Sequence, residues 1–304
     1  MIHLKRKKLA VFAVILIIII SIIAVKFFLE KNVDVLDSAI EYIKDNAASL
    51  VPGNTSDDWA VMILARAGTD ESTLESYTQA LRKYIADKEG VLHARRYTEY
   101  SRLVSVIYYL GENPLDIGGY DVFSPLLDYE IVTKQGVNGA AWALMALDLY
   151  NNTDDEAREY YISSMLDAQN EDGSIGALVG SEVDMTAMCL RALAPYCDRS
   201  EVAKACERGV TFLASRQSES GGFNTAYGES SESTAQVILA LDALGLDIND
   251  ERFDAEKSLY DALISYRNRD GGFSHIKGDK SDLMATVQAV LSLFEIDTEA
   301  EVTE

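Results

Sequence analysis

Six polar residues stand at the start of apolar helical segments, and they are the positions where this chain could carry out chemistry. They are Asp57, Glu99, Asn138, Asp184, Glu232 and Asp282. If all six segments point the same way, these side chains surround one opening. Crowded carboxylates raise one another's pKa or recruit a cation, so a calcium or cationic-ligand site is one hypothesis. The alternative is structural, because an acid at a helix start also caps the helix and interacts favourably with its dipole.

The local sequence around these acids gives a metal or redox site no further support. The chain has neither an EF-hand-like run of acids nor a C-x-x-C pair. Cys189 lies inside an apolar stretch and is predicted to be a core residue, whereas the spacing of Cys197 and Cys206 leaves their pairing open. The acidic pairs at residues 57–58 and 154–155 are interpreted as solvated helix starts.

A repeat sets the positions of three of the acids. A glycine-containing turn recurs with Asp172, Ser220 and Asp270 at equivalent places, 48 and 50 residues apart. The acids Asp184, Glu232 and Asp282 show the same two spacings. Two independent landmarks with one period indicate repeated structural units. Each unit is predicted to consist of an amphipathic outer helix, a glycine turn and an inner helix that is apolar on most sides and therefore buried.

The remaining helices follow from the same alternation. Inner helices are predicted near residues 57–67, 99–110 and 138–149 and from Asp184, Glu232 and Asp282 onward. Outer helices are predicted near residues 32–50, 71–88, 120–132, 154–169, 199–217 and 253–268. Neither end of the array has the polar terminal repeat that an open solenoid needs. The sequence therefore predicts an all-α fold, an α6/α6 toroid with six outer and six inner helices.

The first 29 residues differ in composition from the rest. Four consecutive basic residues at 5–8 precede the apolar residues 9–29, which as a helix span roughly 30 Å, the thickness of a bilayer core. We predict a cytoplasmic segment (1–8), a transmembrane signal anchor (9–29), an exported toroid (30–296) and an acidic tail (297–304). The whole chain has 27 basic and 49 acidic residues, and this acid excess argues against nucleic acid as a partner.

The repeated turns resemble those of a known superfamily. The segments that begin at Gln169, Gln217 and Arg267 look like the repeats of terpene cyclases and protein prenyltransferase β subunits. The chain is most similar to bacterial cell-surface proteins with this prenyltransferase and squalene-oxidase repeat, which are similar to the barrel of transcobalamin and intrinsic factor. The resemblance spans about residues 35–294. It implies the toroid fold and leaves cobalamin as one conceivable ligand, since this fold serves several functions.

The resemblance to protein prenyltransferases implies a zinc site, which the matching residues do not reproduce. That zinc is held by an aspartate, a cysteine two residues later and a histidine. The matching positions here hold Glu232, Thr234 and Ala285, and His275 lies in the preceding loop. Because the thiolate ligand is lost, the sequence argues against zinc chemistry.

The resemblance to class II cyclases implies a proton donor. These enzymes protonate an alkene with the middle aspartate of an Asp-x-Asp-Asp-Thr motif. Asp184 matches that residue, Glu182 matches the first acid, and Met185 replaces the last. Such an acid must be kept protonated by apolar surroundings, and aromatic side chains must stabilise the cation.

Three functions stay open. The first is a membrane-anchored extracellular binding or scaffold module, without catalysis, for an apolar or amphipathic small ligand or a surface protein. Its site would be formed by the six polar residues together with Trp59, Tyr100, Trp142, Phe223 and Phe273. The second is an isoprenoid cyclase with Asp184 as general acid, assisted by Glu182. The third is an anchored toroid that needs another chain to complete it.

Overall fold

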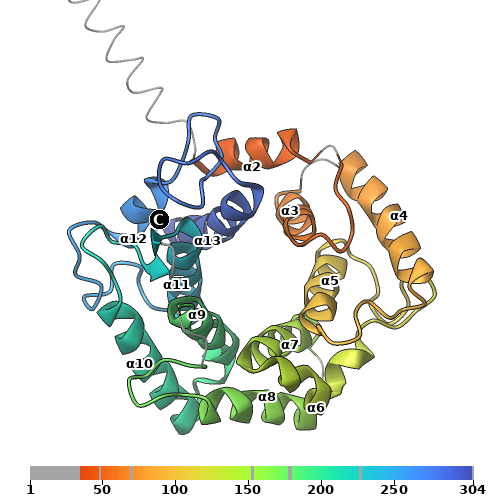
Figure 1. Ribbon diagram of the computed structural model, residues 1–304, viewed down its shortest axis with the longest axis horizontal. Coiled ribbons are helices and arrows are strands. Elements are labelled where there is room, and N and C mark those ends of the chain that lie inside the picture. The colour runs from red at the N-terminus through yellow and green to blue at the C-terminus, as the bar shows by residue number, and fades with distance from the viewer. Residues whose placement is uncertain are drawn as a thin grey trace, which may run out of the picture.

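The helices of the protein form two concentric rings (Figure 1). The computed structural model describes residues 35–47, 49–68, 71–151, 154–176, 180–225 and 228–302. Within these residues the inner ring consists of α3 (Thr55–Arg66), α5 (Thr98–Tyr109), α7 (Val137–Leu149), α9 (Glu182–Leu193), α11 (Ser231–Ala243) and α13 (Leu283–Val302). The outer ring consists of α2 (Val35–Asp45), α4 (Glu71–Asp87), α6 (Tyr129–Val132), α8 (Asp155–Asp167), α10 (Ser200–Ser215) and α12 (Leu259–Ile264).

The chain alternates between the rings, and the inner ring is closed. Each inner helix packs against the next one, and α13 packs against α3. The predicted α6/α6 toroid is therefore confirmed. The predicted membrane anchor at residues 9–29 lies outside the described residues. No helix among the described residues has the length and apolar character needed to cross a bilayer.

Burial explains why the two rings differ in sequence. An inner helix touches two inner neighbours, the outer ring and the centre, so α11 is buried at every position from Ser233 to Leu241. An outer helix buries one stripe, and in α10 this stripe includes Val202, Cys206, Val210 and Leu213, at helical spacing.

Two outer helices are shorter than predicted. The expected helix at 120–132 is divided into a 3-10 turn, Ser124–Leu127, and the short α6, because Pro125 lacks an N–H and is compatible only with a helix start. The expected helix at 253–268 begins only after Ser258, whose hydroxyl caps α12. Before it, the Asp250 carboxylate binds the Arg252 backbone and guanidinium and holds that segment in a turn. At the other end of the chain, α13 continues through Val302, past the predicted boundary of the tail.

The residues of the repeated turn hold the turn together. Gln169 and Gln217 donate from Nε2 to the carbonyl oxygens of Gly173 and Gly221, at 3.0 and 3.1 Å. At the end of the turn, Thr186 Oγ1 accepts the backbone N–H of Ile175 (3.0 Å), and Thr286 does the same for Phe273 (2.9 Å). After the second turn, β1 (Asn224–Thr225) pairs with β2 (Gly228–Glu229) in a short antiparallel hairpin. The repeat signature is thus explained by architecture.

Glycine in this turn also joins one unit to the next. Gly173, Gly221 and Gly271 have positive φ, and a Cβ atom on each would lie 2.4–2.5 Å from a backbone carbonyl oxygen of the following outer element. For Gly271 that oxygen belongs to Ser38 in α2, so the last turn of the ring touches its first helix. Arg267 adds a hydrogen bond of 2.7 Å to the Ser38 hydroxyl.

The cysteines fall into two environments. Cys189 is fully buried in α9, which confirms the predicted core position. Cys197 and Cys206 are free thiols whose sulfur atoms lie 3.4 Å apart. The sequence left their pairing open, and the fold brings them into contact.

Candidate functional site

The six polar residues predicted to surround an opening all lie at the amino-terminal ends of the inner helices. Only Asp282 accepts a hydrogen bond of the capping type, from the Ala285 N–H at 2.9 Å. The caps with side-chain hydrogen bonds in α3 and α11 are Asn54 and Ser230. The capping explanation is therefore wrong for most of the acids. They lie two or three positions after the cap residue, in the first turn, where a negative charge still interacts favourably with the helix dipole.

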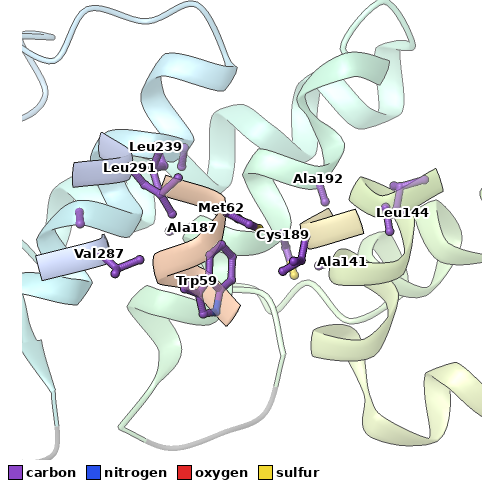
Figure 2. Close-up of a cluster of buried hydrophobic side chains, with 14 of the residues drawn as sticks. Trp59, Met62, Ala141, Leu144, Ala187, Cys189, Ala192, Leu239, Val287 and Leu291 are labelled. Atoms are coloured by element: carbon purple, nitrogen blue, oxygen red, sulfur yellow. The ribbon is translucent and has the colours of Figure 1, made fainter. Parts of the chain in front are cut away.

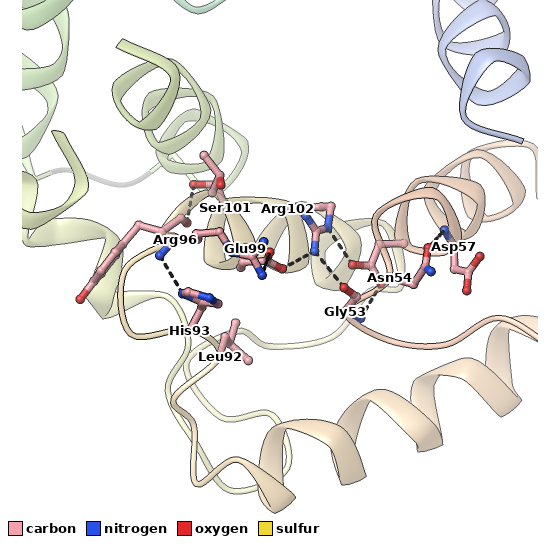
Figure 3. Close-up of polar contacts among 12 residues, drawn as sticks. Gly53, Asn54, Asp57, Leu92, His93, Arg96, Glu99, Ser101 and Arg102 are labelled. Atoms are coloured by element: carbon pink, nitrogen blue, oxygen red, sulfur yellow. Dashed lines mark hydrogen bonds and ion pairs between the residues drawn. The ribbon is translucent and has the colours of Figure 1, made fainter. Parts of the chain in front are cut away.

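Part of this end is occupied by a buried ion-pair network (Figure 3). Arg102 of α5 binds Asp58 of α3 (Nε to Oδ2, 2.7 Å) and Glu99 (2.5 Å). Asp58 also accepts hydrogen bonds from the Tyr77 hydroxyl (2.6 Å) and the Gly53 N–H (3.0 Å). Burial raises the pKa of Asp58, and these partners oppose that effect. The interpretation of Asp58 as a solvated helix start is wrong, because the side chain is fully buried.

Asp184 lies in a different setting, between α9 and α11. Its Oδ1 atom is buried and has no hydrogen-bond partner among the described residues. Burial raises the pKa of Asp184, Ser233 lowers it, Glu232 adds to the increase, and His275 opposes it. His275 Nδ1 lies 2.8 Å from Glu232 Oε2. The predicted partner Glu182 instead accepts the Gly180 N–H at 2.8 Å. Burial thus favours the protonated form of Asp184.

We expect Asp184→Asn to stabilise the protein by about 1 kcal/mol at pH 7, because it removes a negative charge that burial disfavours and whose Oδ1 atom has no hydrogen-bond partner among the described residues. Because the folded-state pKa of Asp184 is raised above the ordinary 3.8, the contribution of this group to stability is fully present below pH 3.8 and is lost as the pH rises through the folded value. The gain should therefore be small at pH 4 and grow toward neutrality. Urea unfolding of the variant and the wild type at several pH values measures this gain in stability. The control is Asp57→Asn, which changes a half-buried side chain in the first turn of α3 and should show no such gain. If the effect of Asp184→Asn did not depend on pH, the raised pKa of Asp184 would be contradicted.

A cavity of about 480 Å³ opens at the opposite end of the barrel. Its wall is built from the carboxyl-terminal halves of the inner helices, and it includes Tyr108 and Tyr109 of α5, Met145 of α7 and Arg191 of α9. The lining residues closest to the amino-terminal ends of their helices are Trp59 and Trp142, whose rings meet edge to face with centroids 5.1 Å apart. This volume lies within the range of small-molecule sites, about 300–1,000 Å³.

The centre of the barrel is filled with side chains below this cavity. Figure 2 shows Trp59 and Met62 of α3 in one apolar cluster with Cys189, Leu239 and Val287 from three other inner helices. Trp59, Met62, Ala192 and Leu291 belong both to this cluster and to the cavity wall, so the cluster closes the cavity on its inner side. Because the cluster fills the space below the cavity, the cavity and the acids belong to opposite ends of the fold.

The structure divides the predicted aromatic residues into two groups. Trp59 and Trp142 line the cavity together. Tyr100, Phe223 and Phe273 are buried in the packing around the barrel and do not contribute to the cavity wall. The Tyr100 hydroxyl accepts the Leu92 N–H at 3.0 Å.

Metal ligands do not converge at either end within the described residues. No group of three or more histidine, cysteine, aspartate or glutamate side chains is close enough there to hold an ion. Glu232 and His275 are two potential ligands in contact, while Thr234 donates its hydroxyl to the Ser230 carbonyl. Asp57 accepts the Val51 N–H, Asn138 is half-buried, and Asp282 is exposed. The described geometry thus gives no support to the calcium hypothesis.

Sequence reasoning missed two features. Asp58 and Arg102 were not recognised as partners, although a basic residue inside an otherwise apolar inner helix was a usable signal. Arg191, in the wall of the cavity, gave the same signal in α9.

The closed double ring of alternating helices defines an α/α toroid. The family profile described as the prenyltransferase alpha-alpha toroid domain matches residues 127–236 and 235–303, more than half of the chain. The protein therefore belongs to the prenyltransferase alpha-alpha toroid domain family. No curated protein has a sequence that matches this chain significantly.

Solved structures share the fold at low sequence identity. The type II terpene cyclase MstE from Scytonema, in complex with geranylgeranyl dihydroxybenzoate, is 12% identical with a TM-score of 0.60, over 86% of this chain and 96% of the cyclase. The unsaturated glucuronyl hydrolase from Bacillus sp. GL1 is 13% identical with a TM-score of 0.58, over 88% and 96%. These likenesses show the fold alone, and the expected likeness to the transcobalamin barrel has no support among them.

Proposed function

We propose that this protein binds an apolar or amphipathic small molecule in the cavity at the carboxyl ends of its inner helices. The observation that carries the proposal is a space of about 480 Å³ with two contacting tryptophans in its wall, next to a barrel centre that is filled with apolar side chains. Protein interiors are close-packed, and open space of this size with aromatic walls is typical of ligand sites.

The tryptophans provide the test. The chain has only two, and both line the cavity, so their fluorescence reports on its contents. Farnesol, a neutral isoprenoid alcohol, is expected to change the emission in a saturable way. Ala243→Phe, at the rim of the cavity, should weaken this binding at least about tenfold by occupying the space.

The matched control is Ala94→Phe, which adds the same side chain at an exposed position outside the cavity. Thermal unfolding of both variants shows whether each one folds. An absence of saturable binding in the wild type, or equal binding by the Ala243→Phe variant, would contradict the proposal.

A second candidate is an acid-initiated cyclase, which the Asp184 carboxyl favours through its buried Oδ1 atom, an atom without a hydrogen-bond partner among the described residues. The raised pKa supports a carboxylic acid that can donate a proton. Incubation with farnesol or a longer polyprenol should then give a product of unchanged mass, and Asp184→Asn should abolish it. A binder would release the probe unchanged and keep its affinity in that variant.

We also propose that the toroid is displayed outside the cell on an anchor at residues 9–29. The support is the basic and then apolar sequence of that segment. Alkaline extraction of membranes tests it, since a spanning helix stays with the bilayer and a peripheral protein is released.

A further inference from the structure

One basic side chain in the cavity wall lacks a partner. Arg191 is in the last turn of α9, and no hydrogen bond or ion pair connects it to any residue that the structure describes. Its basic neighbours differ, because Arg66 binds Glu295 at 2.6 Å and Arg158 binds Asp148. Burial lowers the pKa of Arg191, while Glu295 and Asp242 act in the opposite direction.

Arg191 is half-buried, and its guanidinium lies in the wall of the cavity without an ion-pair partner in the described part of the chain. Withdrawing a charge from water without a partner costs free energy, and such unfavourable groups persist where function requires them. An anion in the cavity would supply the missing partner. Arginine presents two parallel N–H groups, and these match the two oxygens of a carboxylate.

The charge of the surroundings favours a single negative charge on the ligand. Asp148 lines the same cavity, and Glu295 and Asp242 lie close enough to influence Arg191. A diphosphate would bring several negative charges close to these acids, and Arg191 alone would have to balance them. A monocarboxylate matches that cation with one charge and adds less repulsion.

We propose that Arg191 binds the carboxylate of an apolar monocarboxylic acid whose hydrocarbon body lies against Trp59 and Trp142. This inference rests on the proposed function, since it requires the cavity to accept a ligand. It adds the chemical class of the ligand and the residue that selects it.

Three probes with one hydrocarbon chain test the inference: farnesol, farnesoic acid and farnesyl monophosphate. In the wild type, farnesoic acid is expected to bind about 10–100-fold more tightly than farnesol, as a charged hydrogen-bonded pair allows. Arg191→Gln should remove that preference, so that farnesoic acid and farnesol bind with affinities within about twofold of each other. Arg191→Lys, which keeps the charge without the planar pair of donors, should retain only part of it.

The outcomes separate this inference from the function on which it rests. If farnesol binds and farnesoic acid binds no better, the cavity is a ligand site and the role of Arg191 is overturned. If farnesyl monophosphate binds more tightly than the acid, the carboxylate assignment is overturned. If no probe binds, the proposed function fails too. Without ligand, Arg191→Gln is expected to melt at the same temperature as the wild type or higher, and a large decrease would show that Arg191 has a structural partner.

Discussion

Replacing Asp58 with alanine is expected to lower the free energy of unfolding by roughly 3–5 kcal/mol, the usual effect of removing one partner of a buried ion pair. Arg102 would keep its charge in a nearly inaccessible position, with its side chain only 9% exposed. The Tyr77 hydroxyl and the Gly53 N–H would also lose their acceptor. Urea unfolding measures the change as a shift of the midpoint with an unchanged slope.

The adjacent acid is the control for this prediction. Asp57 accepts one backbone N–H, at 3.0 Å from its Oδ2 atom, at a solvent-accessible site. Asp57→Ala should therefore cost at most about 1 kcal/mol. Equal effects of the two substitutions would show that Arg102 does not depend on Asp58.

Gly271→Ala is expected to cost roughly 2–5 kcal/mol and to act on the junction between the two ends of the ring. The φ angle of +90° is unfavourable for alanine by about 1–2 kcal/mol. The new Cβ atom would also lie 2.4 Å from the Ser38 carbonyl oxygen, and overpacking costs about 1–3 kcal/mol. Neither atom belongs to a flexible side chain, so relief requires the turn and α2 to separate.

Gly245→Ala separates the cost of a positive φ from the cost of the close contact. Gly245 also has a positive φ, +66°, but nothing lies within 4 Å of the position of its Cβ atom. This substitution should lower the free energy of unfolding only by the cost of alanine at a positive φ, about 1–2 kcal/mol. Thermal or urea unfolding compares the two variants. If both are destabilised equally, the contact between Gly271 and Ser38 does not help to hold the ring closed.

The fold could be predicted because its information is local and repeated. The 48- and 50-residue spacings placed three units, and the apolar pattern of the inner helices extended the array to six. The sequence did not fix where the outer helices begin and end, because a segment that forms a turn can show the same amphipathic pattern as a helix. The start of α12 is an example. It is set by the turn that Asp250 stabilises and by the Ser258 cap, and neither hydrogen bond appears in the periodicity of the sequence.

The candidate site could be predicted only in part. Sequence placed the acids at one end of the inner helices and identified both tryptophans. It could not show that Trp59 and Trp142 line one cavity at the other end of the barrel, because that depends on how the inner helices pack around the centre. The burial of Asp58 depends on Arg102, which is 44 residues away, and no periodic pattern records such a pair.

Packing of α13 against α3 has a consequence for the order in which the chain folds. Arg66 and Glu295, which bind across this junction, are 229 residues apart, as are Ser38 and Arg267. Neighbouring units are separated by about 50 residues. Because loop-closure entropy grows only with the logarithm of length, joining the ends costs about 1.3 kcal/mol more than joining neighbours. A few hydrogen bonds offset that difference at equilibrium, yet such distant contacts form slowly. We therefore expect the junction between α13 and α3 to form last during folding.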